Sequence, residues 1–167
     1  MLLPEKLRPY RLLLASQSPR RRELMNGCGL PYAPAPPYEC EEVYPDKLAA
    51  EEVPAYLSQL KSDAFPRPLA PDEILMTADT VVILDGRVLG KPRDRDDAFA
   101  MLRRLSGHSH TVVSGVTLRT AARRRTFSAR TEVWFRILSD EEIVFYIDSY
   151  RPYDKAGSYG IQEWIGY

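Results

Sequence analysis

Cysteine is scarce in this sequence, with Cys28 and Cys40 the only two among 167 residues. Their spacing fits neither a metal-binding motif nor a disulfide framework, so we expect a reducing compartment and a cytoplasmic protein. No apolar stretch is long enough to cross a bilayer. The first residues, with only the short apolar run Leu12–Ala15, do not have the form of a signal peptide. The sequence therefore predicts no membrane partner.

An excess of charge of either sign is also missing. Lys plus Arg and Asp plus Glu number 23 each, so the formal net charge is zero. Because proteins that bind polyanions are usually basic, this balance argues against a stable nucleic-acid complex but leaves room for a local anion site. Apolar residues make up 44% and charged residues 28%, which is ordinary for a soluble globular protein, and the length suffices for one domain with a core.

The stretch Ile74–Leu84 is almost wholly apolar and contains one acidic residue, Asp79. The unbroken run Val81–Leu84 predicts a strand covered on both faces, followed by an Asp85-Gly86 turn and a short return strand. A carboxylate inside such a strand must be paired, hydrogen-bonded or bound to a metal ion. The return strand brings Lys91 back toward Asp79. Two interpretations are open, a metal-bound phosphate site or a buried Asp–Lys ion pair without chemistry.

A second feature is the predicted strand Arg11–Ala15, which runs directly into a helix. Ser18 is a suitable N-cap and Pro19 suits the first helical position. The free N–H groups of such a helix start, with Ser16 beside them, form a ready anion site. The alternative is an ordinary capped helix with a solvated basic first turn. The run Arg20–Arg22 opposes the helix dipole, which favours phosphate binding over a purely structural role.

The remaining pattern predicts an α/β protein. We expect a Pro- and Tyr-rich loop over 31–46, helices over about 49–65, 95–105 and 140–149, and a hairpin of 111–119 and 126–137 with three arginines at its tip. The residues after Tyr150 read as an apolar strand that carries a few polar groups. Because a domain rarely ends within a strand, we expect the chain to lack a C-terminal segment.

Five motifs occur in a fixed order along the chain. They are Ser16-Gln-Ser-Pro-Arg-Arg21, Ala78-Asp-Thr80, Gly90-Lys-Pro92, Leu105-Ser-Gly-His108 and Asp154-Lys-Ala-Gly-Ser-Tyr-Gly-Ile-Gln162. Together they resemble the Maf family of nucleoside-triphosphate pyrophosphatases over nearly the whole chain. The resemblance implies a single Maf-like domain over 1–167, with an elongated mixed sheet flanked by helices and a central cleft, similar to the inosine-triphosphate pyrophosphatases. It also implies a divalent cation (Mg²⁺, Mn²⁺ or Co²⁺) and release of a nucleoside monophosphate and pyrophosphate.

The resemblance further implies roles for individual residues. Asp79 matches the catalytic general base that acts on water, and Lys61 and Lys91 match catalytic lysines that face the phosphates. Glu42 and Asp79 are the implied metal ligands, although Glu41 also lies in the acidic loop and leaves open which of the two glutamates contacts the metal. The implied substrate-binding residues are Ser16, Arg20, Arg21, Thr80, Asp154, Lys155 and Gln162.

Three positions bear on the choice of substrate. Arg20, Thr80 and Gln162 resemble the branch that acts on dTTP and UTP, whereas the 7-methyl-GTP branch carries a bulky aromatic residue in place of Arg20. Gln162 both donates and accepts hydrogen bonds, which suits the O4/N3 edge of a pyrimidine. Two alternatives stay open: a pyrophosphatase for modified nucleotides such as 7-methyl-GTP, and a non-enzymatic cell-division regulator that binds nucleic acid. The sequence is compatible with a homodimer and does not decide the oligomeric state.

Overall fold

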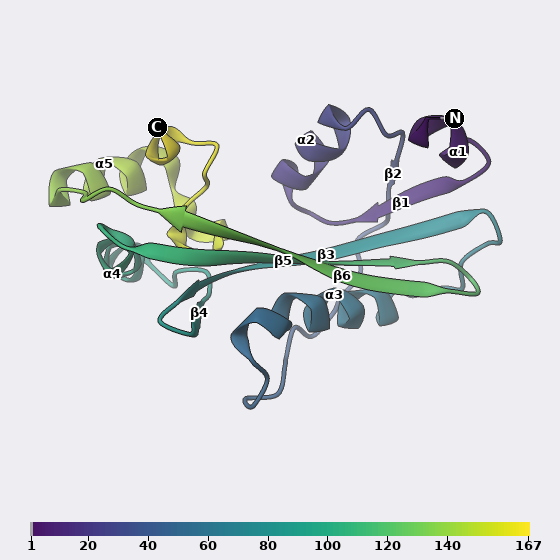
Figure 1. Cartoon of the computed structure of the whole chain (residues 1–167), viewed down its shortest axis with the longest axis horizontal. Helices are drawn as coiled ribbons and strands as arrows, with labels where there is room; N and C mark the ends of the chain where they lie inside the picture. The colour runs from purple at the N-terminus through teal and green to yellow at the C-terminus, as the bar shows by residue number, and fades with distance from the viewer. Residues whose placement is uncertain (1) are drawn as a thin grey trace. The chain divides into compact units, whose positions relative to one another are not determined.

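The computed structural model describes residues 2–167 and shows helices flanking a mixed β-sheet (Figure 1). The elements are α1 (Leu3–Leu7), β1 (Arg11–Ala15), α2 (Pro19–Gly27), β2 (Ala33–Pro34), η1 (Ala50–Glu52), α3 (Val53–Asp63), β3 (Glu73–Leu84), β4 (Arg87–Leu89), α4 (Arg95–Leu105), β5 (Ser109–Arg119), β6 (Arg124–Trp134), α5 (Asp140–Tyr150), η2 (Pro152–Asp154), η3 (Ala156–Ser158) and η4 (Trp164–Gly166). The predicted α/β class with a mixed sheet is confirmed.

The sheet has the strand order β2-β1-β3-β5-β6, with β4 paired to β3 beside this path. β1 runs parallel to both neighbours, and Leu13 pairs with Ala33 of β2 and with Leu75 of β3. β4 is antiparallel to β3. Between these two strands, Asp85 and Gly86 have positive φ angles of 51° and 73°, as a two-residue hairpin turn requires. The predicted turn is confirmed.

The chain forms two compact units. The first contains the residues up to Asp79 together with 114–128, and the second contains 80–113 and 129–167. The strands β3, β5 and β6 contribute residues to both. Among residues 2–167 no helix combines the length and the apolarity that a membrane crossing needs.

In the first unit, the short strand β1 packs on both of its faces. Leu12 and Leu14 contact Met25 of α2, whereas Leu13 belongs to the cluster around Phe65, which follows α3. Figure 1 shows α2 and α3 on opposite sides of β1 and β3. Because neighbouring residues of a strand point to opposite faces, three successive leucines supply both layers of this core.

Helix α3 is fastened to the sheet by buried polar side chains. Ser58 Oγ lies 2.8 Å from Thr117 Oγ1 on β5, and Thr77 Oγ1 on β3 donates to the Ser58 carbonyl oxygen at 2.6 Å. Burying a hydroxyl without such partners is costly. These bonds fix α3 relative to β3 and therefore fix Lys61, which lies about one turn after Ser58.

Gly115 on β5 allows the backbone of α3 to approach closely. A Cβ at this position would lie 2.3 Å from the Ala55 amide nitrogen. Replacing Gly115 by Ala should therefore lower the free energy of unfolding by about 2–3 kcal/mol in urea denaturation, the cost of overpacking against backbone. Gly27→Ala is the control, because a Cβ at Gly27 has no heavy atom within 4 Å. An equal loss in both variants would contradict this explanation.

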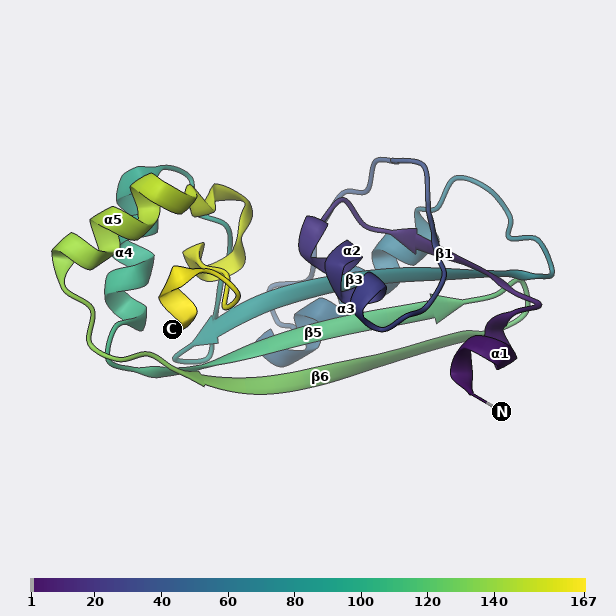
Figure 2. The same cartoon turned by 90° about the horizontal axis from the view of Figure 1, so that it is seen from above.

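In the second unit, α4 and α5 lie side by side and form most of the core (Figure 2). Leu102 and Leu105 of α4 and Ile143 and Ile147 of α5 are all fully buried. The strand segment Val81–Leu84 is buried throughout, which confirms the prediction of a strand covered on both faces.

His110 is buried in this second unit beside two aromatic rings. Its Nε2 lies 2.6 Å from the Tyr159 hydroxyl, and its ring makes edge contacts with Phe135 and Tyr159. With only 4% of the residue exposed, burial lowers the pKa of His110 from 6.5 to about 4. The neutral ring is thus the form that the folded state accommodates.

This burial predicts a pH dependence of stability. Between pH 6.5 and 4 the unfolded chain binds a proton at His110 that the folded chain does not, so stability falls as the pH drops through this window, by about 3 kcal/mol in total. His110→Gln should flatten this part of the curve in denaturation at several pH values, and the exposed His108→Gln should leave it unchanged. The bond to Arg67 lowers the pKa of Glu73 to about 2. Carboxylates of this kind change the stability only below about pH 4.5, outside most of this window. A wild-type curve that is flat from pH 6.5 to 4.5 would contradict the prediction.

Two predictions about local structure are wrong for β2 and β6, the two edge strands of the sheet. The loop predicted over 31–46 contains β2, whose Pro34 lies at the edge of the sheet, where a missing N–H group is tolerated. Arg124 and Arg125 begin β6 instead of lying in the turn, and Arg124 pairs with Asp63 of α3.

The strand predicted after Tyr150 is also wrong. Residues 152–166 form the three short turns η2, η3 and η4. Pro152 begins the first turn, and Gly157 and Ser158 adopt positive φ angles of 66° and 63°. Two successive residues with positive φ exclude an extended strand.

Candidate functional site

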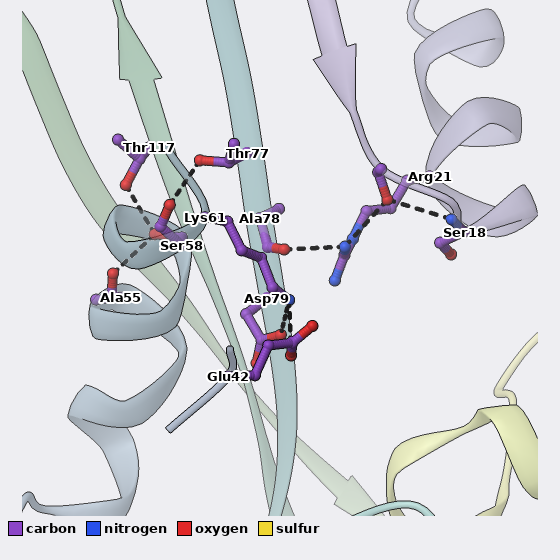
Figure 3. A network of polar contacts seen from close by, with 11 residues as sticks. Ser18, Arg21, Glu42, Ala55, Ser58, Lys61, Thr77, Ala78, Asp79 and Thr117 are labelled. Carbon is purple, nitrogen blue, oxygen red and sulfur yellow. Dashed lines mark hydrogen bonds and ion pairs between the residues drawn. The ribbon is translucent and has the colours of Figure 1, made fainter. Parts of the chain in front are cut away.

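The turn between β1 and α2 holds a guanidinium group against β3. Arg21 Nη1 donates to Ser16 Oγ at 3.2 Å and to the Ala78 carbonyl oxygen at 3.0 Å (Figure 3). Ser18 occupies the N-cap position of α2, as predicted, but its side chain makes no capping hydrogen bond; its amide donates to Ser16 Oγ at 3.3 Å. The three contacts place the basic first turn of α2 beside the residue that precedes Asp79.

Charges of both signs surround Arg21. Burial lowers the pKa of Arg21, the nearby carboxylate of Asp79 opposes this shift, and the neighbouring Arg20 adds to it. Two guanidinium groups so close to each other are stabilised by an anion between or beside them. This environment favours the phosphate interpretation of the turn over a solvated helix start.

Lys61 joins two carboxylates in the same unit. Its Nζ lies 2.6 Å from Asp79 Oδ1 and 3.0 Å from Glu42 Oε2 (Figure 3). Asp79 is only 9% exposed and the Lys61 side chain 17% exposed. Asp79 therefore belongs to a buried Asp–Lys ion pair, but its lysine is Lys61 from α3 and not Lys91, the partner that the sequence suggested.

Three features of α3 favour this position of Lys61. Ser58 ties the helix to β3 and β5, as described above. Lys61 lies in the last turn, where the helix dipole favours a cation. Its carbonyl oxygen accepts a hydrogen bond at 2.7 Å from the hydroxyl of Tyr38, a residue that sequence analysis did not single out. A tyrosine in a Pro-rich loop gives no sequence signal for such a contact.

The first unit thus gathers six of the predicted site residues, which are Ser16, Arg20, Arg21, Glu42, Lys61 and Asp79. Ala15, the last residue of β1, pairs with Thr77 of the parallel strand β3. Ser16 directly follows the carboxyl end of β1, and Asp79 lies within β3, two residues beyond the last pair with β1. Ligands of open α/β sheets often bind beyond the carboxyl ends of parallel strands. Three basic groups and two carboxylates suit a highly charged phosphate anion with its counter-cation.

The carboxylates of Glu42 and Asp79 converge on a single cation, the Lys61 ammonium. Within residues 2–167, no group of three or more His, Cys, Asp or Glu side chains is arranged to hold a metal ion. Two carboxylates alone fit Mg²⁺, which takes its other ligands from phosphate oxygens and water. Both glutamates are exposed, but the ion pair with Lys61 favours Glu42 over Glu41 as the loop ligand.

The second unit contains the other five predicted site residues, which are Thr80, Lys91, Asp154, Lys155 and Gln162. Lys91 and Gln162 are exposed, and Thr80 is half-buried. The side chain of Lys155 is 8% exposed, and its Nζ lies 2.9 Å from Asp154 Oδ1 and 3.2 Å from Glu163 Oε1. Sequence analysis missed Glu163, which directly follows Gln162 at the end of the fifth motif. Residue by residue, the catalytic and binding roles stay predictions.

Taken together, these observations describe an α/β protein whose first unit gathers basic side chains and carboxylates beside the end of β1. The family profile described as "Maf-like protein" matches residues 11–167. A "dTTP/UTP pyrophosphatase" of Phocaeicola vulgatus is 54% identical over 163 residues, covering 98% of this chain and 84% of the relative. A protein of the same name from Bacteroides thetaiotaomicron is 52% identical, covering 95% of this chain and 82% of the relative.

A "dTTP/UTP pyrophosphatase" of Porphyromonas gingivalis is 49% identical, covering 98% of this chain and 83% of the relative. Among solved structures, a HAM1 protein from Coxiella burnetii aligns with a TM-score of 0.44 and 13% identity, over 75% of this chain and 72% of that chain. The chain belongs to the family of Maf-like proteins. The resemblance stated from the five motifs is confirmed.

Proposed function

We propose that this protein is a nucleoside triphosphate pyrophosphatase that hydrolyses dTTP and UTP to the nucleoside monophosphate and pyrophosphate. The relatives that carry this name are about half identical to it over nearly the whole chain. The observation that carries the proposal is Lys61 between Glu42 and Asp79, beside the guanidinium of Arg21. A site for a triphosphate needs both basic groups and carboxylates for a cation, and this cluster contains both.

In the proposed reaction, water attacks the α-phosphorus, and the bond from that phosphorus to the α–β bridging oxygen breaks. Asp79 orients the water and accepts its proton, while pyrophosphate leaves with the bridging oxygen. Arg20, Arg21 and Lys61 hold the phosphate oxygens and neutralise their charge. Glu42 and Asp79 would hold a divalent cation, which would further neutralise the charge of the phosphates.

For the site residues that lie in the second unit, we propose the roles that the family resemblance implies. Lys91 is proposed to face the phosphates, and Asp154 and Lys155 to belong to the substrate-binding segment. Thr80 and Gln162 are proposed to select the base. An exposed Gln162 amide donates and accepts at once, which suits the pyrimidine O4/N3 edge. A site that recognises its base through such hydrogen bonds discriminates strongly against a base that cannot form them.

A nucleotide panel tests the proposal. Pyrophosphate release would be measured from dTTP, UTP, CTP, GTP and 7-methyl-GTP with Mg²⁺, Mn²⁺, Co²⁺ or a chelator. We expect turnover of dTTP and UTP above the others, and none with the chelator. A preference for 7-methyl-GTP would show that the substrate is a modified nucleotide instead of dTTP and UTP. If no nucleotide were turned over with any of the metals, the enzymatic function would be overturned.

The two neighbouring glutamates give a matched prediction about the metal. Glu42→Gln should raise the Mg²⁺ concentration for half-maximal activity at least about tenfold, because it removes one of two carboxylates from a site whose other protein ligand is Asp79. Glu41→Gln should change it less than about twofold, because the carboxylate that lies beside Lys61 together with Asp79 is that of Glu42. If Glu41→Gln raised the required Mg²⁺ concentration more than Glu42→Gln, the metal ligand in the loop would be Glu41.

We further propose a cytoplasmic location, a nucleoside triphosphate as the substrate that the protein binds, and no stable nucleic-acid complex. Cys28 and Cys40 are free thiols, which supports a reducing compartment. Arg124, one of the arginines that a nucleic acid would contact, is already paired with Asp63. Nucleic-acid binding that falls steeply with salt would contradict this proposal. Light scattering would decide between a monomer and the homodimer that the sequence allows.

A further inference from the structure

Glu163 uses both of its carboxylate oxygens inside the second unit. Oε1 lies 3.2 Å from the Nζ of Lys155, and Oε2 accepts a hydrogen bond from the Tyr146 hydroxyl of α5. The same hydroxyl accepts a hydrogen bond from the Gly160 amide at 3.0 Å. One carboxylate thus connects both ends of the segment 155–163 to each other and to α5.

The segment folds tightly onto this carboxylate. A Cβ at Gly160 would lie 3.2 Å from Glu163 Cδ and 3.3 Å from Lys155 Cε, so the glycine backbone packs directly against the ion pair. Tyr146 is fully buried, and its hydroxyl needs partners at that depth. The contacts of Glu163 therefore fix a definite backbone path through residues 155–163.

Burial makes Glu163 the important partner of Lys155. The lysine side chain is 8% exposed, the Glu163 side chain 24% and the Asp154 side chain 58%. An exposed ion pair contributes little, whereas a buried ammonium without a close carboxylate is costly. Two carboxylates compensate the charge of Lys155, which leaves the exposed amide of Gln162 as the group of this segment that is available to a ligand.

We propose that Glu163 is a positioning residue that holds Gln162 in place for base selection. This inference rests on the proposed function, in which Gln162 reads the pyrimidine edge. Gln162 directly precedes Glu163, so anchoring the Glu163 side chain to Lys155 and Tyr146 restricts where the Gln162 amide can lie. A specificity group must be held by such supporting contacts to discriminate between bases.

The kinetic test compares Glu163→Ala, Glu163→Gln and a control. Glu163→Ala should raise KM for dTTP about tenfold and lower the ratio of kcat/KM for dTTP over GTP about tenfold, with kcat changed less than about threefold. Glu163→Gln keeps an acceptor for Tyr146 and should fall between this variant and the wild type. The control is Asp148→Asn on α5, which removes an exposed ion pair with Arg95 and should change neither value. Equal losses of kcat/KM for dTTP and GTP would overturn the positioning role.

Hydrogen exchange provides a readout that does not depend on activity. In Glu163→Ala the Gly160 amide and its neighbours should exchange at least about tenfold faster, while the protection of β3 stays unchanged. Unchanged protection at Gly160 would overturn the inference even if the wild type hydrolyses dTTP. If the Gly160 amide exchanged faster in Glu163→Ala but the wild type hydrolysed no nucleotide, Glu163 would still hold the segment. The proposed function would then be wrong, and with it the role of Glu163 in base selection.

Discussion

Replacing Asp79 by Asn should lower kcat for dTTP at least about 100-fold, because a positioned general base typically contributes about 10²–10⁴-fold. Asn has nearly the same shape but does not accept the proton of the attacking water. The substitution also removes the carboxylate that lies 2.6 Å from the Lys61 ammonium, yet Glu42 remains as a second partner. The fold should therefore persist. Pyrophosphate release at saturating dTTP and metal measures the effect.

Asp85→Asn is the matched control for this variant. Asp85 directly follows β3 in the hairpin turn, is exposed, and has a positive φ of 51° that Asn tolerates well. Its kcat should stay within about twofold of the wild type. If Asp79→Asn kept near-normal turnover while binding dTTP, the assignment of Asp79 as the general base would be wrong. A loss of dTTP binding alone would assign Asp79 to substrate or metal binding.

Local signals explain why the two parts of the first-unit site could be predicted. Asp79 is conspicuous because its strand is otherwise apolar, and burial of that strand is decided by the adjacent residues Val81–Leu84. The turn before α2 follows from Ser18 and Pro19, which specify a helix start over a few residues. Both features depend on short stretches of chain, so the sequence pattern is sufficient.

The partner of Asp79 depends instead on tertiary structure. Hairpin geometry suggested Lys91, the lysine that is nearer along the chain after the turn. The structure gives Asp79 the ammonium of Lys61, which α3 supplies because Ser58 is bonded to Thr77 and Thr117. The contact between Ser58 and Thr117 joins residues 59 positions apart, and no local periodicity encodes it. Only the family resemblance pointed to Lys61.

The tail shows the opposite failure, in which a local pattern was misleading. Its apolar residues suggested a strand, but Ser158 has a positive φ of 63°, a conformation that serine rarely signals. Its turns are held by Tyr146 and Glu163, whose contacts connect α5 to the segment. A pattern of apolar residues does not reveal a buried polar network, so the role of Glu163 emerged only from the structure.

Replacing Lys61 by Met should lower kcat/KM for dTTP at least about 100-fold, comparable to the loss of a preorganised charge in other active sites. Met keeps much of the length and the apolar surface of Lys but removes the ammonium shared by Glu42 and Asp79. Without nucleotide, the two carboxylates would then face each other with no cation between them. Their affinity for Mn²⁺ in the absence of nucleotide should therefore rise, by about tenfold in a titration.

The opposite directions of these two effects separate a change in the site from a damaged fold. A variant that merely unfolds would lose both dTTP turnover and Mn²⁺ binding. The loss of the shared ammonium should instead lower dTTP turnover and strengthen Mn²⁺ binding. Lys47→Met is the control, since Lys47 is an exposed residue of the same unit and its charge is largely screened. If Lys61→Met kept kcat/KM within about threefold of the wild type, the ammonium would only hold the loop of Glu42. Weaker Mn²⁺ binding in a folded Lys61→Met protein would show that the two carboxylates need Lys61 to stay together.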